Sequence, residues 1–258
     1  MSHSTSSSKL RRPACRLLLA PFLAAFSVAS GQEPRDAGVR DFEETEALKP
    51  LAKGFTKNVL LDQKAIWTSP FHMTRTDAKW WLTFAAITGA AVATDHRTAR
   101  QLPNTADQRT YSRDLSQMGA AYTLIPIAGG FYLSGVLAKS ARLRGTGLLS
   151  SQALADALVV SEVLKVAAGR QRPLDGDGAG RFFHGGGSFP SGHAIESFAL
   201  ASVIAHRYRN KKAVVIVVYG LATLIGASRF SGQKHFASDV VAGGVMGWFI
   251  GRHVFETQ

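Results

Sequence analysis

Three clusters of polar residues lie in the C-terminal half of the chain, and packing alone would not account for their residue types. The clusters are Lys165 with Arg172-Pro173, then Pro190-Ser191-Gly192-His193, then Ser228-Arg229 with His235 and Asp239. They offer three cations, two histidines, a carboxylate, hydroxyl groups and a glycine. Such a set is suited to holding a phosphate-like oxyanion beside a nucleophile and a proton donor.

The first cluster ends an apolar segment with positive charge. Lys165 and Arg172 are seven residues apart, which is two helical turns, so they share one face if the helix continues that far. Pro173 limits that continuation. Gly169 and Arg170 between them predict an open, basic end. The alternative is a basic end that is merely solvated or binds lipid headgroups.

The second cluster, Pro190–His193, immediately precedes the apolar run Ala194–His206. A helix that starts here would present free N–H groups and a dipole that favours an anion. Ser191 can cap this end or donate its hydroxyl to a bound oxygen, and the Gly192 backbone can approach a ligand closely. His193 is a candidate general acid, because an unperturbed histidine has a pKa near 6.5. The alternative is a plain capping motif with an incidental histidine.

The third cluster places His235 four residues before Asp239, so the two side chains would be neighbours on one helix. A carboxylate bonded to one ring nitrogen fixes the tautomer and leaves the other nitrogen free to attack. The alternative is a surface His–Asp pair. Metal binding is disfavoured, because one His and one Asp are too few ligands and the neighbouring cations would repel a metal ion. We therefore expect neither a metal nor another cofactor.

The elements that must position these clusters are apolar runs rich in Ala, Leu and Gly, which predict helices rather than strands. The six runs are Trp80–Thr94, Met118–Ala138, Leu148–Ala168, Ala194–His206, Ala213–Ala227 and Val240–Phe255. The predicted connections carry turn or charge signals at residues 95–97, 142–145, 207–212 and 232–234. The sequence thus predicts an all-α domain over residues 80–258, with the motif-bearing core at 148–255.

The N-terminal region divides into two parts. Residues 1–31 have a basic lead, an apolar run Leu17–Ala29 and small residues at its end, which predicts an export signal or an uncleaved anchor. Residues 32–79 begin polar and become amphipathic, which predicts one or two surface helices that end near Ser69-Pro70. Cys15 is the only cysteine, so no intramolecular disulfide can form.

The amino-acid composition limits the kinds of molecule that the protein is expected to bind. The chain has 258 residues, 46% of them hydrophobic, and a formal net charge of +12. That charge suits a phosphorylated substrate or an anionic lipid. Nucleic acid is disfavoured, because no zinc-finger, basic-region or aromatic-interleaved pattern accompanies the charge. The sequence does not indicate a protein partner.

A membrane-embedded bundle is favoured over a soluble exported one. Met118–Ala138 is long enough to span a bilayer, although several other segments are short. The connections at 139–144 and 207–212 are basic and carry none of the clusters, so the positive-inside rule places them in the cytoplasm and the clusters outside. If 32–79 is exported, a spanning Trp80–Thr94 would invert this topology. That segment then lies against the surface, the N-terminus stays inside, or nothing after the signal spans.

Taken together and in order, the clusters resemble the type 2 phosphatidic acid phosphatase / vanadium haloperoxidase superfamily. The pattern of that family is Lys-x6-Arg-Pro, Pro-Ser-Gly-His and Ser-Arg-x5-His-x3-Asp, and this chain matches it without a departure. The resemblance covers roughly Leu148–Phe255. It implies an all-α, six-helix core bundle.

The resemblance also implies roles. His235 would attack phosphorus to give a phosphohistidine, Asp239 would orient it, and His193 would protonate the leaving oxygen. The expected phosphate ligands are Lys165, Arg172, Arg229, Ser191 and the Gly192 backbone, with no metal. The substrate would be a lipid phosphate or diphosphate, such as phosphatidic acid, a polyprenyl diphosphate or phosphorylated lipid A, at a bacterial-type inner membrane with the site facing the periplasm. Alternatives are a soluble periplasmic or secreted acid phosphatase, a vanadium haloperoxidase, and a non-catalytic lipid-binding protein.

Overall fold

The structure, a computed structural model, describes residues 53–72, 74–103 and 105–258. Within these residues it consists of helices and loops, without strands. The α-helices are α4 (Phe55–Thr68), α5 (Arg75–Gln101), α6 (Ala106–Ser116), α7 (Ala121–Leu137), α8 (Ala141–Ala168), α9 (Gly192–Arg207), α10 (Lys212–Ser231) and α11 (Ala237–Thr257). Two short 3-10 turns, η1 (Ser69–Phe71) and η2 (Gln117–Gly119), follow α4 and α6. The predicted all-α class is confirmed for the described residues. The predicted signal or anchor at 1–31 lies outside them.

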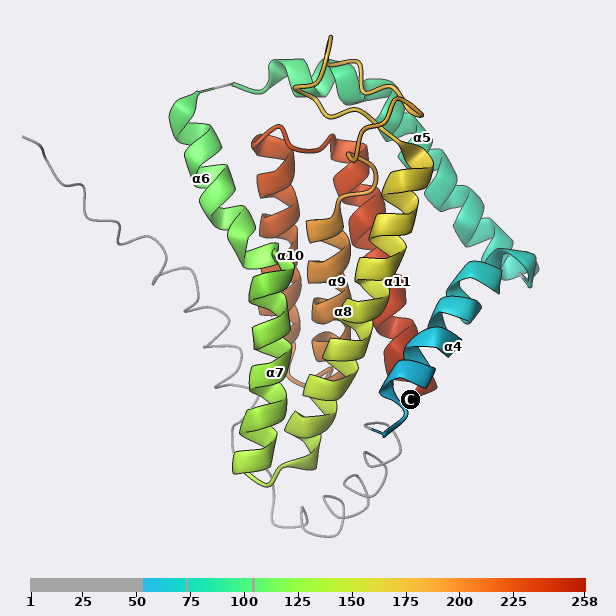
Figure 1. Cartoon of the computed structure of the whole chain (residues 1–258), viewed down its shortest axis with the longest axis vertical. Coiled ribbons are helices and arrows are strands. Elements are labelled where there is room, and N and C mark those ends of the chain that lie inside the picture. Colours follow the sequence, from blue (N-terminus) through green and yellow to red (C-terminus); the bar gives the residue numbers. More distant parts are fainter. Residues whose placement is uncertain (1–52, 73, 104) are drawn as a thin grey trace, which may run out of the picture.

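Helix α9 lies at the centre of the bundle and packs against α8, α10 and α11 (Figure 1). Twelve of its 16 residues are buried, because the sequence offers small and apolar side chains on every face. Helix α7 covers the outside of α8. Burial on all sides makes α9 the element against which the others are positioned.

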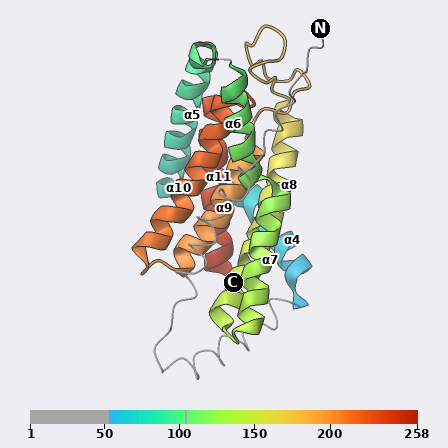
Figure 2. The same ribbon diagram turned by 90° about the vertical axis from the view of Figure 1, so that its left-hand side faces the viewer.

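Three helices from the N-terminal part lie outside this bundle. Helix α5 packs against α11, α6 against the end of α10, and α4 against α8, as Figures 1 and 2 show from two directions. The prediction of a helix that ends near Ser69-Pro70 is confirmed, since α4 ends at Thr68. Helix α6 was not predicted, because its sequence, ADQRTYSRDLS, contains few apolar residues.

All six predicted apolar segments are helical, but two predicted connections are wrong. Residues 95–97 lie within α5, where the Asp95 side chain is buried and paired rather than exposed in a turn. Residues 142–145 lie within α8, which starts at Ala141 because the Ser140 hydroxyl accepts a hydrogen bond from the Leu143 N–H. The connections at 207–212 and 232–234 are confirmed.

The three clusters lie at one end of the bundle, and the two basic connections lie at the other. In Figure 1 the loop 169–191 and the α10–α11 connection are at the top, while the α7–α8 and α9–α10 connections are at the bottom. The alternating direction of α7 to α11 produces this separation. Chemistry-bearing residues from three distant parts of the chain thus meet at one end.

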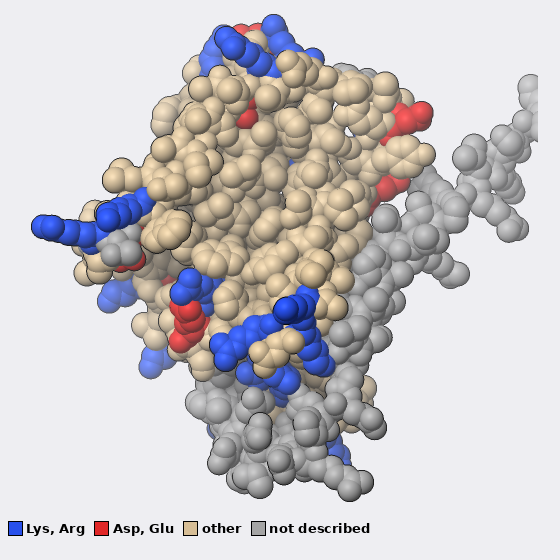
Figure 3. Space-filling model, turned by 180° about the vertical axis from the view of Figure 1, so that it is seen from behind, with Lys and Arg blue, Asp and Glu red and all other residues tan. Residues whose placement is uncertain are grey.

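Within the described residues, three stretches are long and apolar enough to cross a membrane: Ala106–Leu137, Ala141–Ala168 and Lys212–Ser231. On the face shown in Figure 3, uncharged surface forms a broad expanse, and Lys and Arg side chains gather above and below it. This distribution is typical of a surface in contact with hydrocarbon between two polar boundaries.

Candidate active site

The first cluster is divided by the end of α8. Lys165 lies in the last turn, and the helix stops at Gly169, whose φ of 52° is the left-handed conformation that glycine adopts most readily. Arg172 therefore lies in the following loop, exposed, and does not continue a helical face with Lys165. The Lys165 ammonium donates to Glu162 Oε1 at 2.6 Å.

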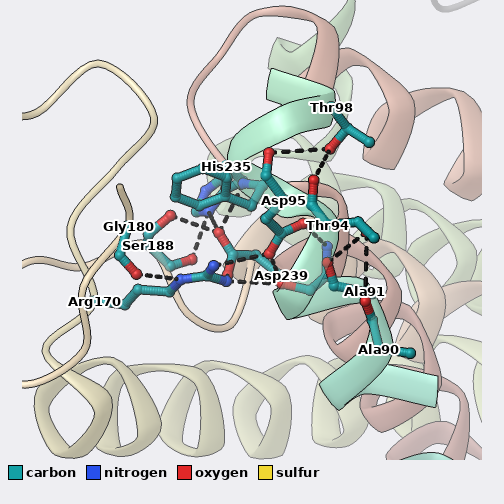
Figure 4. Close-up of polar contacts among 12 residues, drawn as sticks. Ala90, Ala91, Thr94, Asp95, Thr98, Arg170, Gly180, Ser188, His235 and Asp239 are labelled. Atoms are coloured by element: carbon teal, nitrogen blue, oxygen red, sulfur yellow. Dashed lines mark hydrogen bonds and ion pairs between the residues drawn. The ribbon is translucent and has the colours of Figure 1, made fainter. Parts of the chain in front are cut away.

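Arg170 is not part of an open end, as the sequence had suggested, but is buried with 1% of its surface exposed. Its guanidinium lies over the rings of Phe182 and Phe236, 4.7 and 4.3 Å from their centroids. It donates to Gly180 O at 3.1 Å, Ser238 Oγ at 2.7 Å, Asp239 Oδ1 at 2.6 Å and Asp95 Oδ2 at 2.8 Å (Figure 4). A buried cation needs such pairing, since desolvation otherwise costs several kcal/mol.

The second cluster forms the N-terminus of α9. Ser191 is the N-cap residue, yet its side chain makes no capping bond, and its buried Oγ has no hydrogen-bond partner. A Cβ added to Gly192 would lie 3.0 Å from the Lys165 ammonium, so any other residue would require the lysine side chain to shift. Of the two roles predicted for the Ser191 hydroxyl, the cap is not made. The hydroxyl and the first N–H groups of α9 remain available to an anion.

His235 lies before α11 rather than on it, so the predicted helical neighbour relation with Asp239 is wrong. Its Nδ1 is 2.6 Å from the Ser188 carbonyl oxygen, whereas Asp239 Oδ2 is 3.8 Å away, beyond hydrogen-bond distance. A carbonyl oxygen only accepts, so Nδ1 carries the proton and Nε2 keeps its lone pair. The Ser188 carbonyl is therefore the direct orienting group for the imidazole.

Asp239 influences the orientation of His235 indirectly, through Ser188. Its Oδ2 accepts from the Ser188 hydroxyl at 2.5 Å and from the Phe236 N–H at 2.8 Å. Its backbone oxygen accepts from the Ser191 N–H at 3.0 Å. The Asp239 carboxylate thus fixes Ser188, which orients His235. The backbone oxygen of Asp239 links α11 to the start of α9.

Asp95 extends the same network into α5. One of its oxygens pairs with Arg170, and Ser238 donates to the carboxylate through both its backbone N–H, at 3.1 Å, and its hydroxyl. The network of Asp95, Arg170, Ser188, His235, Ser238 and Asp239 is called the Arg170 network below (Figure 4). Buried and extensively hydrogen-bonded, it fixes the start of α11 relative to the loop after α8.

Arg229 reaches the site from the last turn of α10. Its Nη1 donates to Ser116 Oγ at 3.1 Å, while its Nε has no hydrogen-bond partner. Its backbone oxygen accepts from the N–H groups of Lys234 and His235, which folds the α10–α11 connection back over the helix end. This fold brings His235 to the same end as the guanidinium.

The electrostatics of the two histidines show that the clusters share one environment. Burial, together with the charges of Arg229, His235 and Lys165, lowers the pKa of His193 to about 3. Burial also lowers the pKa of His235, and Asp239 opposes that shift only in part. Both imidazoles are therefore neutral near pH 7 in the ligand-free protein.

Sequence reasoning missed the structural roles of Arg170, Asp95, Ser188 and Ser116. Arg170 and Asp95 each interrupt or end an apolar segment, which is a signal for a buried ion pair as much as for a turn. Ser188 orients His235 through its backbone carbonyl, which no residue type reveals, although its hydroxyl also binds Asp239. Within the described part of the chain, no group of three or more His, Cys, Asp or Glu side chains is placed to hold a metal ion.

Comparisons with known proteins show which proteins the C-terminal part of the chain is similar to. The family model described as the PAP2 superfamily matches residues 145–258. A lipid A 1-phosphatase of Porphyromonas gingivalis is 32% identical over 131 residues, covering 50% of this chain and 28% of that protein. Phosphatidylglycerophosphatase B of Bacillus subtilis is 30% identical over 146 residues, covering 52% of this chain and 66% of that protein.

The chain thus aligns with less than two thirds of the length of either relative. Among solved structures, a transmembrane PAP2-type phosphatidylglycerolphosphate phosphatase from Bacillus subtilis has a TM-score of 0.48 and 23% identity. That match covers 80% of this chain and 94% of the other.

Proposed function

Residues 145–258 belong to the PAP2 superfamily, and from this premise we propose that the protein is a phosphatase that hydrolyses a phosphomonoester or diphosphate of a lipid. The observation that carries the proposal is the His235 imidazole, whose Nδ1 is bound to the Ser188 carbonyl and whose Nε2 keeps its lone pair. The names of the two relatives, lipid A 1-phosphatase and phosphatidylglycerophosphatase B, support a lipid substrate.

The proposed phosphate ligands are Lys165, Arg172, Arg229, the Ser191 hydroxyl and the Gly192 N–H. Support comes from the partnerless Ser191 Oγ and Arg229 Nε, both buried polar atoms that would gain a hydrogen bond from a bound anion. The N-terminus of α9 adds its dipole. These groups would oppose the charge on the equatorial oxygens during transfer.

In the proposed reaction His235 Nε2 attacks phosphorus and forms an N–P bond as the P–O bond to the lipid breaks. His193 gives its proton to the leaving lipid oxygen. It then takes a proton from a water molecule, whose oxygen attacks the phosphohistidine and releases inorganic phosphate. Asp239 is a positioning residue here, because it reaches His235 through Ser188. Nothing in this sequence of steps needs a metal.

Binding of the anionic substrate would itself raise the pKa of His193. In the ligand-free protein, burial and neighbouring positive charges keep its pKa at about 3. A bound phosphate neutralises those charges, which raises the pKa and favours the protonated general acid. Proton donation would thus depend on an occupied site.

We further propose that the protein is embedded in a bacterial-type inner membrane, with the site facing the periplasm. The three apolar stretches support embedding. The basic connections at 139–144 and 207–212 lie at the end opposite the site, which supports this orientation under the positive-inside rule. The expected sixth core helix stays a proposal: α7 to α11 form the bundle, and α5, which packs on α11 from outside it, is the candidate for the sixth.

The test is phosphate release by the full chain from phosphatidic acid, a polyprenyl diphosphate and phosphorylated lipid A, assayed in membrane and soluble fractions. We expect activity in the membrane fraction and its loss in His235→Ala. His72→Ala, which removes an exposed imidazole after η1, is the matched control and should retain activity. Rapid quenching and mass spectrometry should find phosphate on His235. Full activity in His235→Ala would refute the proposal.

A further inference from the structure

A cavity of about 330 Å³ lies between α6 and the C-terminal end of α10, beside the candidate active site. Its lining combines cations and hydroxyl groups with few apolar side chains. The cations are Arg109, Arg113, Arg229 and Lys234, and the hydroxyl groups are those of Thr110, Ser112, Ser116 and Ser228. No carboxylate is among the lining residues, so the cavity suits an anion rather than an apolar group.

Helix α6 is fixed where it borders this cavity. Gln108 Nε2 donates to Ser231 O at 2.7 Å, and the Ser112 and Ser231 hydroxyls are 2.5 Å apart. Ser116 accepts from Arg229 at 3.1 Å. These three residues of α6 are spaced four apart, so one face of the helix is held against α10 along its length. The cavity wall is therefore preorganised rather than formed by a loose segment.

Arg229 joins the cavity to the reaction site. Its side chain lines the cavity, and its positive charge also lowers the pKa of His193. Arg109 and Arg113 are one turn apart on α6 and add positive charge to the cavity lining. Asp114 lies 3.6 Å from Arg113 Nε and offsets part of that charge. The charged residues of the lining itself are all cations.

We propose that this cavity is a subsite for a second anionic group of the substrate, a phosphate next to the scissile one. The inference rests on the proposed function and narrows it. Substrates with two adjacent phosphates, such as a lipid diphosphate, are favoured over a lipid monophosphate. Arg109 and Arg113 are the specificity-determining residues, and Arg229 is shared by both phosphates. A monophosphate would place no second anionic group in the cavity.

The experiment compares a polyprenyl diphosphate with the monophosphate of the same prenyl chain, using the full chain in detergent. We expect wild-type kcat/KM to favour the diphosphate by about tenfold or more. Arg109→Gln/Arg113→Gln should reduce that preference about tenfold, while kcat/KM for the monophosphate stays within about twofold. The matched control, Arg97→Gln/Arg100→Gln, removes equal charge from exposed positions on α5 and should leave the preference unchanged.

A second measurement uses methylenediphosphonate, which cannot be hydrolysed, as a competitive inhibitor. Its inhibition constant should rise about tenfold in the α6 double variant, while that of orthophosphate stays constant. Equal wild-type rates on both lipids, or an equal loss on both in the double variant, would overturn the subsite. The absence of phosphate release from either lipid by the wild type would instead overturn the proposed function itself.

Discussion

Each end of α11 has a histidine close to an aspartate, and the two pairs have opposite electrostatics. Before the helix, His235 Nδ1 is 3.8 Å from Asp239 Oδ2, and the pKa of His235 is lowered. In its last turns, His253 Nε2 is 3.1 Å from Asp62 Oδ1 of α4, and the pKa of His253 is raised. The same two residue types therefore favour a neutral imidazole at one end and a charged one at the other.

The difference comes from the other neighbours of each pair. The Asp239 carboxylate is already paired with Arg170, and His235 is buried, so burial outweighs the carboxylate. Asp62 accepts from the neutral amide of Gln152 at 2.5 Å, and its hydrogen bond with His253 is the main cause of the raised pKa. A His–Asp pair in a sequence thus does not fix the protonation state. For His235 burial outweighs the aspartate, whereas for His253 the hydrogen bond to the aspartate outweighs burial.

Asp239→Asn should give the largest effect and separate the two pairs. The variant leaves Arg170 with one buried carboxylate and weakens the hold on Ser188, so kcat/KM should fall by about 10³-fold. Asp62→Asn, the matched change at the other end, should keep kcat/KM within about threefold. The measurement is phosphate release, with circular dichroism to verify folding. Equal losses in the two variants would show that the pairs do not differ in function.

Arg170→Gln should raise the pKa of His235, so that the His235–Asp239 pair resembles the His253–Asp62 pair. Without the guanidinium, Asp239 is uncompensated and raises the pKa of His235, so the imidazole becomes protonated at acid pH and cannot attack. We expect a loss of about 100-fold at pH 5, a smaller loss at pH 8, and a lower Tm. The readout is the pH–rate profile. The control is Arg252→Gln, which breaks an exposed pair with Glu256, and a pH-independent loss in Arg170→Gln would contradict the explanation.

The wild-type pH–rate profile should reveal the source of the proton that the leaving group takes up. Because the pKa of His193 is about 3 in the ligand-free protein, the proton for the leaving group must arrive with a substrate monoanion. The second pKa of a phosphate monoester is about 6, so kcat/KM should fall about tenfold per pH unit above that value. A rate that rises from pH 6 to pH 8 would be inconsistent with this mechanism.

The smallest effect is expected at the His253 pair and concerns stability. A raised folded-state pKa means that the pair stabilises the fold fully below the ordinary value near 6.5, and that this contribution is lost as the pH rises through the folded-state value. The wild-type Tm should therefore drop by a few degrees from pH 6.5 upward. His253→Gln should remove this dependence without changing activity at pH 6. An unchanged pH dependence of Tm in the variant would assign it to other groups.

Much of the fold followed from the sequence, because long apolar runs identify helices regardless of their partners. All six were found, and the clusters do meet at one end. Residues 95–97 were misread as a turn because a charged residue in an apolar run has two explanations. Only the tertiary structure reveals that Arg170, far along the chain, pairs with Asp95. Helix α6 was missed because its contacts with α10 are polar.

The site was predicted as a set of residues but not as a set of contacts. Lys165, His193 and Arg229 act on one another electrostatically, as three converging clusters require. The i, i+4 spacing of His235 and Asp239 predicted a direct hydrogen bond, yet α11 begins only at Ala237, where Asp239 binds the Phe236 N–H. The orienting oxygen belongs to a backbone, and periodicity carries no information about backbone carbonyls in loops.

Asp95 and Ser116 both lie upstream of the region that matches the family model. A chimera that joined residues 145–258 to the N-terminal helices of another protein would keep every proposed reacting group. It would nevertheless leave Arg170 without its second carboxylate and Arg229 without its serine ligand, unless the donor helices supplied equivalents. Whether the donor helices offer partners for Arg170 and Arg229, more than sequence similarity within residues 145–258, would decide which chimeras are active.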